Sequence, residues 1–223
     1  MEHISIKGLT KSYGKGTKTL EVLKGIDLEI EKGETVAILG ASGAGKSTFL
    51  NIMGALDHPT SGEVFYNSAS IFTMGEKKLA SFRNSTVGFV FQFHHLLAEF
   101  TALENVMLPA LIGGKSYMEA KETGEALLRD VGLKDRLDHK PGELSGGEQQ
   151  RAAMVRALVQ TPEVLLADEP TGNLDTKTGE EVFELLLKLN REKNITLAVV
   201  THNERLAQKM NRRLTMVDGR LFG

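Results

Sequence analysis

The stretch Gly40–Thr48 carries residue types that can hold a chain of phosphates. Its sequence, GASGAGKST, fits the pattern GxxxxGK[ST] of a phosphate-binding loop. The glycines let the backbone turn several N–H groups toward one anion, and Lys46 adds a mobile positive charge. The Ser47 hydroxyl can ligate Mg²⁺. We therefore expect a nucleoside triphosphate to contact Gly40, Ala41, Ser42, Gly43, Ala44, Gly45, Lys46, Ser47 and Thr48.

Further polar side chains follow apolar runs elsewhere in the chain. Asp168 can hold Mg²⁺, and the neighbouring Glu169 can accept a proton from an attacking water, although two adjacent acids also suit a solvated turn. His202 could hydrogen-bond a terminal phosphate or the water, or it could be structural. Gln92 could orient the water or ligate Mg²⁺ through its amide oxygen, or it could be a surface amide at a strand end.

The elements that must position these groups form a strand–helix alternation. A short apolar strand precedes the phosphate-binding loop and a helix follows it, which is the context that the motif needs. Further buried strands alternate with helices, which predicts a largely parallel sheet. The predicted strands are 35–39, 87–91, 163–167 and 195–200. Ligands of such sheets bind at the carboxyl ends of the strands, so we expect the candidate residues to form one site.

The remaining segments predict two additions to this α/β core. Residues 4–9, 26–30 and 64–66 have the alternating or apolar pattern of short strands near the amino terminus. From residue 93 to about residue 160 helical patterns dominate, which predicts a helical insertion into the core. Within it, the turn Leu144–Glu148 places Ser145 as a helix N-cap. Its backbone N–H groups could also bind a second anion.

The composition limits the function classes. The chain has 223 residues, 41% of them hydrophobic and 25% charged, which is typical of a globular protein with one substantial core. A net charge of −2 gives no global footprint for nucleic acid, and the lack of cysteine excludes disulfides and thiolate metal sites. No signal peptide and no apolar run of about 18 residues is visible, so we expect any membrane role to need a separate partner chain.

Taken together, these motifs resemble the ATP-binding subunits of ABC transporters over essentially the whole chain. The sequence LSGGE at 144–148, followed by the acidic pair at 168–169, is close to diagnostic of that family. The resemblance implies one ABC ATPase domain over residues 1–223, with a P-loop NTPase (RecA-like) α/β core at 1–92 and 160–223. It also implies a mainly parallel sheet, an antiparallel β subdomain at the amino terminus, and an inserted α-helical subdomain at 93–159 that carries the signature motif.

The family also implies roles for the candidate residues. Two copies would face each other head to tail, with ATP and Mg²⁺ between the phosphate-binding loop of one copy and Ser145, Gly146 and Gly147 of the other. Tyr13 would stack on adenine, Glu169 would be the general base, and His202 the switch histidine. Gln92 would couple the site to integral membrane subunits docking on the helical insertion, and residues 173–175 would cross the dimer seam. Position 148 departs from the family by carrying Glu where Gln is commonest.

The stretch Phe91–Val106 looks like the lipoprotein-releasing ATPases, which act at the cytoplasmic face of the bacterial inner membrane. The stretch Ala167–Asp175 suits a wider group that includes macrolide-exporter and cell-division ATPases, and these stay alternatives. The end of the chain at Gly223 favours a membrane domain on a separate subunit. A soluble ABC-type ATPase acting on DNA or ribosomes would need a coiled-coil insertion, tandem domains or a basic patch, and a P-loop GTPase would need an [NT]KxD motif. The sequence shows none of these.

Overall fold

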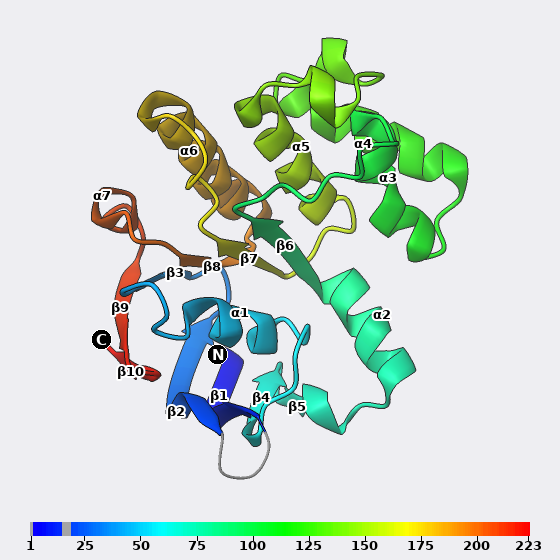
Figure 1. The fold of residues 1–223 in the computed structure, drawn as a ribbon. Coiled ribbons are helices and arrows are strands. Elements are labelled where there is room, and N and C mark those ends of the chain that lie inside the picture. Colours follow the sequence, from blue (N-terminus) through cyan, green and yellow to red (C-terminus); the bar gives the residue numbers. More distant parts are fainter. Residues whose placement is uncertain (1, 15–18) are drawn as a thin grey trace.

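The computed structural model describes residues 2–14 and 19–223, which fold into two sheets and a group of helices (Figure 1). The first sheet is antiparallel, with strand order β2-β1-β4-β5. Its strands are β1 (Glu2–Tyr13), β2 (Leu20–Glu31), β4 (Ser61–Tyr66) and β5 (Ala69–Ser70). This sheet confirms the predicted antiparallel addition near the amino terminus.

The second sheet has the order β10-β9-β3-β8-β7-β6 and is parallel from β9 to β6. Its parallel strands are β3 (Thr35–Leu39), β6 (Val87–Phe91), β7 (Val164–Asp168), β8 (Thr196–Val200) and β9 (Arg212–Val217). The short β10 (Arg220–Phe222) pairs antiparallel with β9 at one edge. The predicted mainly parallel sheet is therefore confirmed.

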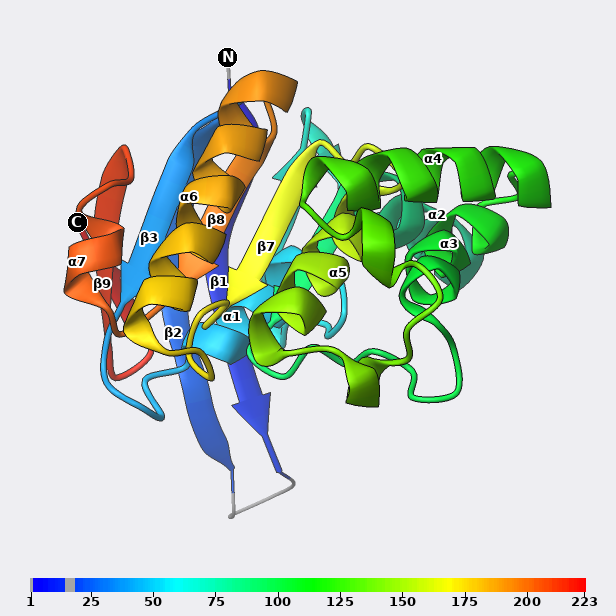
Figure 2. The ribbon, with the colours of Figure 1, turned by 90° about the horizontal axis from the view of Figure 1, so that it is seen from above.

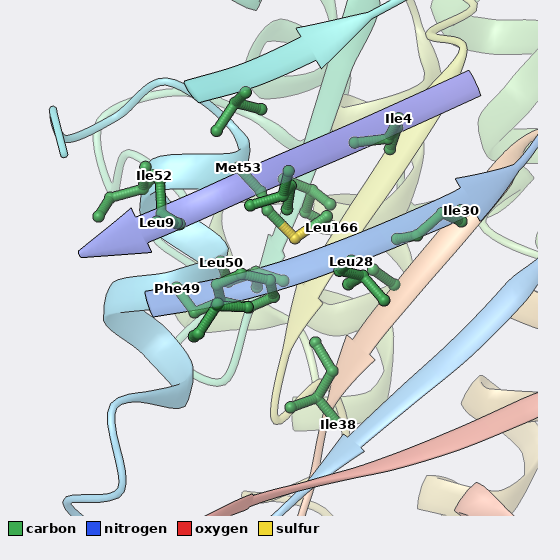
Figure 3. Close-up of a cluster of buried hydrophobic side chains, with 14 of the residues drawn as sticks. Ile4, Leu9, Leu28, Ile30, Ile38, Phe49, Leu50, Ile52, Met53 and Leu166 are labelled. Carbon is green, nitrogen blue, oxygen red and sulfur yellow. The ribbon is translucent and has the colours of Figure 1, made fainter. Parts of the chain in front are cut away.

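Helix α1 (Lys46–Met53) lies between the two sheets (Figure 1). Its buried Phe49 and Leu50 pack with Leu28 of β2 and Ile38 of β3, as Figure 3 shows. The central strands β3, β7 and β8 bury apolar side chains on both faces of the parallel sheet, because alternate residues point to opposite sides. Such burial explains why these strands are continuous apolar runs in the sequence.

The opposite face of the parallel sheet is covered by helices. The long helix α6 (Thr176–Lys193) packs Phe183 and Leu186 against Leu197 and Val199 of β8. The short helix α7 (Glu204–Ala207) contributes Leu206 to the same cluster. Helix α2 (Glu76–Thr86) leads from the antiparallel sheet to β6.

The predicted helical insertion consists of α3 (Ala102–Ile112), α4 (Tyr117–Asp130) and α5 (Gly146–Leu158), with short 3-10 turns at Lys134–Arg136 and Pro141–Glu143. These helices share a separate hydrophobic cluster and stand to one side of the parallel sheet (Figure 2). Each begins with a capping box, in which a Ser or Thr side chain and a Glu three residues later satisfy each other's backbone N–H. A further 3-10 turn, Ile71–Thr73, precedes α2.

Among the residues that the structure describes, no helix has the length and apolar content needed to cross a bilayer.

Candidate functional site

The register of the parallel sheet brings the candidate residues to one edge. Phe91 of β6 pairs with Asp168 of β7, and Asp168 pairs with Val200 of β8. Val200 also pairs with Ile38 of β3, just before the phosphate-binding loop. The residues that follow these strand ends therefore meet at the carboxyl edge of the sheet, as the sequence predicted.

A cavity of about 470 Å³ opens at this edge. It is lined by predicted site residues from all four strand ends: Gly40, Ser42, Gly43, Gly45, Lys46, Ser47, Thr48, Gln92, Asp168, Glu169 and His202. Val22 of β2 and Val200 of β8 add apolar surface. Sequence reasoning missed Val22, because an apolar residue inside a strand carries no chemical signal.

The phosphate-binding loop wraps around the start of α1. Gly40, Gly43 and Gly45 all have positive φ angles, and a Cβ at Gly40 would lie 2.3 Å from the Met216 carbonyl oxygen of β9. Lys46 is 9% exposed, and its Nζ donates to the carbonyl oxygens of Gly40 and Ala41 at 2.7 and 2.9 Å. The loop therefore holds a nearly buried cation at the positive end of a helix, which suits a polyphosphate.

The carboxylate of Asp168 lies beside the phosphate-binding loop. Burial raises the pKa of Asp168 above its ordinary value; a hydrogen bond with the Ser47 side chain opposes the rise, the charge of Glu169 adds to it, and Lys46 opposes it. The predicted metal ligands Ser47 and Asp168 are thus in contact. A carboxylate that is costly to ionise here gains from a nearby cation.

Glu169 and His202 form a hydrogen-bonded pair. The Nδ1 atom of His202 lies 2.8 Å from Oε1 of Glu169, with the Glu169 side chain 16% exposed and that of His202 73% exposed. The backbone of Glu169 has a φ angle of +45°, which is uncommon outside glycine. Its N–H donates to the Val200 carbonyl, which holds the residue at the strand edge.

Gln92 is held by the segment that follows Glu169. Its Nε2 donates to Oδ1 of Asn173 at 3.1 Å, and Nδ2 of Asn173 donates back to the Gln92 carbonyl at 3.0 Å. A Cβ at Gly172 would lie only 2.8 Å from Nε2 of Gln92. The absence of a side chain at position 172 therefore leaves room for the Gln92 amide.

Helix α5 ties these segments together through side chains that sequence reasoning missed. The nearly fully buried Gln150 donates from Nε2 to the carbonyl oxygens of Phe91 and Pro170, at 3.3 and 2.6 Å. Arg156 donates to the carbonyl oxygens of His94 and His95. The segments that carry Gln92 and Glu169 are therefore both hydrogen-bonded to α5.

Several predicted site residues do not line the cavity: Tyr13, Ala41, Ala44, Ser145, Gly146 and Gly147. Tyr13 ends β1 and is 43% exposed; its hydroxyl donates to Oδ2 of Asp57 at 2.7 Å, and Nζ of Lys11 lies 4.7 Å from its ring centroid. Burial and the Asp57 hydrogen bond raise the pKa of Tyr13, while a side-chain hydrogen bond with Thr48 lowers it. Tyr13 thus lies beside the end of the phosphate-binding loop.

Ser145 is the N-cap of α5, as predicted. Its side chain accepts from the Glu148 N–H, and Glu148 accepts from the Ser145 N–H. In the part of the chain that the structure describes, no hydrogen-bond acceptor contacts the N–H groups of Gly146 or Gly147. The turn therefore presents free donors at a helix start, outside the cavity.

Known proteins share both the sequence and the fold. Residues 23–172 match the ABC transporter family. The lipoprotein-releasing system ATP-binding protein LolD of Syntrophus aciditrophicus is 60% identical over 98% of both chains, and that of Geobacter metallireducens is 58% identical over 98% of this chain and 97% of its own. The dimeric ATP-binding cassette MJ0796, solved in a post-hydrolysis state with ADP and Pi, superposes with a TM-score of 0.90 and is 41% identical, covering 98% of this chain and 96% of its own.

The geometry of the cavity agrees with all three comparisons. The family match covers more than half of the chain, the relatives are similar over nearly its full length, and the neighbouring structure has hydrolysis products bound. The chain belongs to the ABC transporter family and is one of its ATP-hydrolysing cassettes.

Proposed function

We propose that this chain is the ATP-hydrolysing subunit of a transporter that releases lipoproteins from the bacterial inner membrane. The observation that carries the proposal is the 60% identity, over 98% of both chains, to a protein named for the lipoprotein-releasing system. The cavity supplies the chemistry that such a subunit needs, because the phosphate-binding loop with Lys46 and the Glu169–His202 pair line the same cavity.

The residues of the cavity have different roles in hydrolysis. Lys46 and the N–H groups of the loop bind the triphosphate and offset its charge. Glu169 accepts the proton of the attacking water, and His202 orients the Glu169 carboxylate through its hydrogen bond. Gln92, held by Asn173, lines the same cavity and orients the water.

Mg²⁺ would be held by Ser47, Asp168 and the amide oxygen of Gln92. These donors fit the ion, because Mg²⁺ in nucleotide sites is bound by one or two carboxylates together with substrate phosphates rather than by an all-protein cage. Among the described residues there is accordingly no cluster of three or more metal-binding His, Cys, Asp or Glu side chains. When bound, the ion neutralises charge on the phosphates.

Each site would be completed by a second copy of the chain. Ser145, Gly146 and Gly147 lie outside the cavity of their own chain but present donors at the start of α5. The neighbouring structure MJ0796 is a dimer, which supports this arrangement. In it, the exposed Tyr13 would stack on adenine.

Integral membrane subunits would dock on the helical insertion, at the cytoplasmic face of the inner membrane. Helix α5 connects that insertion to the cavity, since Gln150 and Arg156 bind the segments that carry the water-orienting side chains. Movement of the insertion would therefore reach Gln92 and Glu169. No nucleic-acid partner is proposed, because the net charge of −2 gives no basic footprint.

The test is purification of the tagged chain from detergent-solubilised membranes, followed by reconstitution of the captured complex into vesicles that carry a lipoprotein. We expect integral membrane subunits to copurify, and ATP to release the lipoprotein. A matched complex carrying Glu169→Gln should assemble equally well but release nothing. Full ATPase activity in a stable complex without any membrane subunit would contradict the proposal.

A further inference from the structure

The turn Leu144–Glu148, which we call the signature turn, carries the negative charge of Glu148 beside the start of α5. Glu148 lies one turn into α5 and caps it: Oε2 accepts the Ser145 N–H at 2.8 Å, while the Glu148 N–H donates to Ser145 Oγ at 3.3 Å. This cap leaves the N–H groups of Gly146 and Gly147 for a ligand. The carboxylate therefore shares a helix start with the donors proposed to meet ATP.

That arrangement creates an electrostatic conflict. The backbone hydrogen bond from Ser145 is the main cause that lowers the pKa of Glu148, and contacts with the Ser145 and Arg136 side chains lower it further, against the effect of burial. Glu148 is thus ionised at neutral pH. A carboxylate at a helix start competes with any other anion for the same positive end, so it opposes the approach of a triphosphate.

Arg136 offsets this charge. Its Nε donates to Oε1 of Glu148 at 3.0 Å, so both carboxylate oxygens have a donor. Arg136 ends a 3-10 turn whose following residues are anchored to the start of α3: Leu103 N–H donates to the Leu137 carbonyl at 3.0 Å and Ala102 N–H to that of His139 at 2.8 Å. The guanidinium is therefore presented by a segment that the fold holds in place.

We propose that Arg136 is a positioning residue for ATP: it neutralises Glu148, so that the signature turn of one copy can accept the triphosphate held by the other copy. The inference rests on the proposed function, because it requires the two-copy site. Arg136 acts through Glu148 and touches no nucleotide.

This role differs measurably from that of an ordinary structural ion pair. If Arg136 only shapes the turn, its loss cannot be repaired by changing Glu148. If it neutralises charge, Glu148→Gln removes the need for it, because the Gln amide oxygen can still accept the Ser145 N–H without a negative charge. The double variant Arg136→Gln/Glu148→Gln therefore separates the two roles.

The experiment measures ATP-driven dimerisation by analytical ultracentrifugation in a Glu169→Gln background, where hydrolysis does not reopen the dimer. We expect Arg136→Gln to raise the dimer dissociation constant roughly tenfold, because binding at each of the two ATP sites should weaken about threefold and the two effects multiply. The double variant should return to within about twofold of the background. Arg129→Gln is the matched control, since Arg129 is an exposed arginine of α4 for which the described residues provide no ion pair, and it should change nothing.

The outcomes are distinguishable. Unchanged dimerisation in Arg136→Gln, or a double variant as weak as the single one, overturns the role of Arg136 while the two-copy site stands. A Glu169→Gln background that binds ATP but stays monomeric overturns the two-copy site and this inference with it. Titration of the monomer with nucleotide controls for misfolding. Arg136 does not line the cavity of its own chain, so the Arg136→Gln monomer should bind ATP as the background does.

Discussion

The ATP cavity and the signature turn use the same elementary device, a helix start with free N–H groups, yet they are built differently. The cavity gathers polar and charged side chains from four strand ends, including the nearly buried Lys46 and the half-buried Asp168. The signature turn consists of one capped helix whose polar groups largely satisfy each other. The cavity is therefore a charged site at the edge of the sheet, whereas the turn is a locally satisfied structure whose proposed role requires a second copy.

A comparison within the helical insertion supports this difference. The capping box of α4 has the same pattern as that of α5: Ser116 N–H donates to Glu119 at 2.8 Å, and Glu119 N–H donates back at 3.3 Å. Apart from a further hydrogen bond in α4, from Ser116 Oγ to Glu119 Oε2 at 2.6 Å, the cap of the signature turn matches this ordinary helix start. What differs is its surroundings: a Cβ at Gly147 would lie 2.5 Å from Thr178 at the start of α6, close to the segment that holds Gln92.

The largest expected effect comes from removing the proposed general base, which belongs to the cavity and not to the signature turn. Glu169→Gln should lower the rate of ATP hydrolysis about 100- to 10,000-fold, because the amide cannot accept the proton of the attacking water. ATP binding should persist, since Lys46 and Ser47 are unchanged, and the dimer should accumulate because closure no longer leads to hydrolysis. Phosphate release and light scattering measure the two effects. Near-normal turnover would remove Glu169 from the role of base.

The second effect tests whether the signature turn has a role beyond capping. Ser145→Ala and Ser116→Ala should each destabilise the fold by about 1 kcal/mol, because each removes an N-cap acceptor. In the Glu169→Gln background, we expect Ser145→Ala alone to weaken ATP-driven dimerisation by about tenfold or more, since a hydrogen bond to a charged phosphate is lost at each site. Equal dimerisation of the two variants in the ultracentrifuge would reduce the turn to an ordinary cap.

The sequence predicted the cavity better than it predicted the connections between regions. Asp168, Glu169, Gln92 and His202 each follow an apolar run, and the carboxyl ends of parallel strands must lie together, so their convergence was predictable. Gln150 gave no such signal. It is a polar residue in a helix, the usual pattern of a solvent-exposed position, and its partners are backbone carbonyls about 60 and 20 residues away, which only the folded chain brings near.

The third effect concerns the segment between the two regions. Gly172→Ala would place a Cβ 2.8 Å from Nε2 of Gln92 and 3.1 Å from its Cδ, so the flexible amide must move. We expect hydrolysis to fall roughly three- to tenfold through misplacement of Gln92, with little loss of stability. Gly142→Ala is the matched control, because a Cβ there meets nothing within 4 Å. Equal rates for the two variants would show that the Gln92 amide tolerates displacement.

The smallest effect is a pH-dependent change in stability without nucleotide. Burial is the main cause that raises the pKa of Asp168, so the folded chain binds that proton more tightly than the unfolded chain, and ionisation of Asp168 costs stability as pH rises. Asp168→Asn avoids the ionisation. We expect it to melt roughly 1 to 2 °C above the parent at pH 7.5, and the difference to shrink as pH falls toward about 4, where an unfolded Asp is also protonated.

The same substitution, Asp to Asn, should lower the melting temperature when it is made at a helix cap. Asp175 is the N-cap of α6, where hydrogen bonds from Thr178, first from its side chain and then from its N–H, lower the pKa of the carboxyl. Asp175→Asn keeps a capping oxygen but loses a charge that the helix start favours, so the parent should be the more stable at pH 7.5, by an amount that disappears as pH falls. Melting curves of both variants at matched pH would sharpen the comparison. Opposite changes in melting temperature would mean that ionised Asp168 destabilises the cavity, whereas ionised Asp175, seven positions later, stabilises the start of α6. Changes of the same sign would refute that distinction.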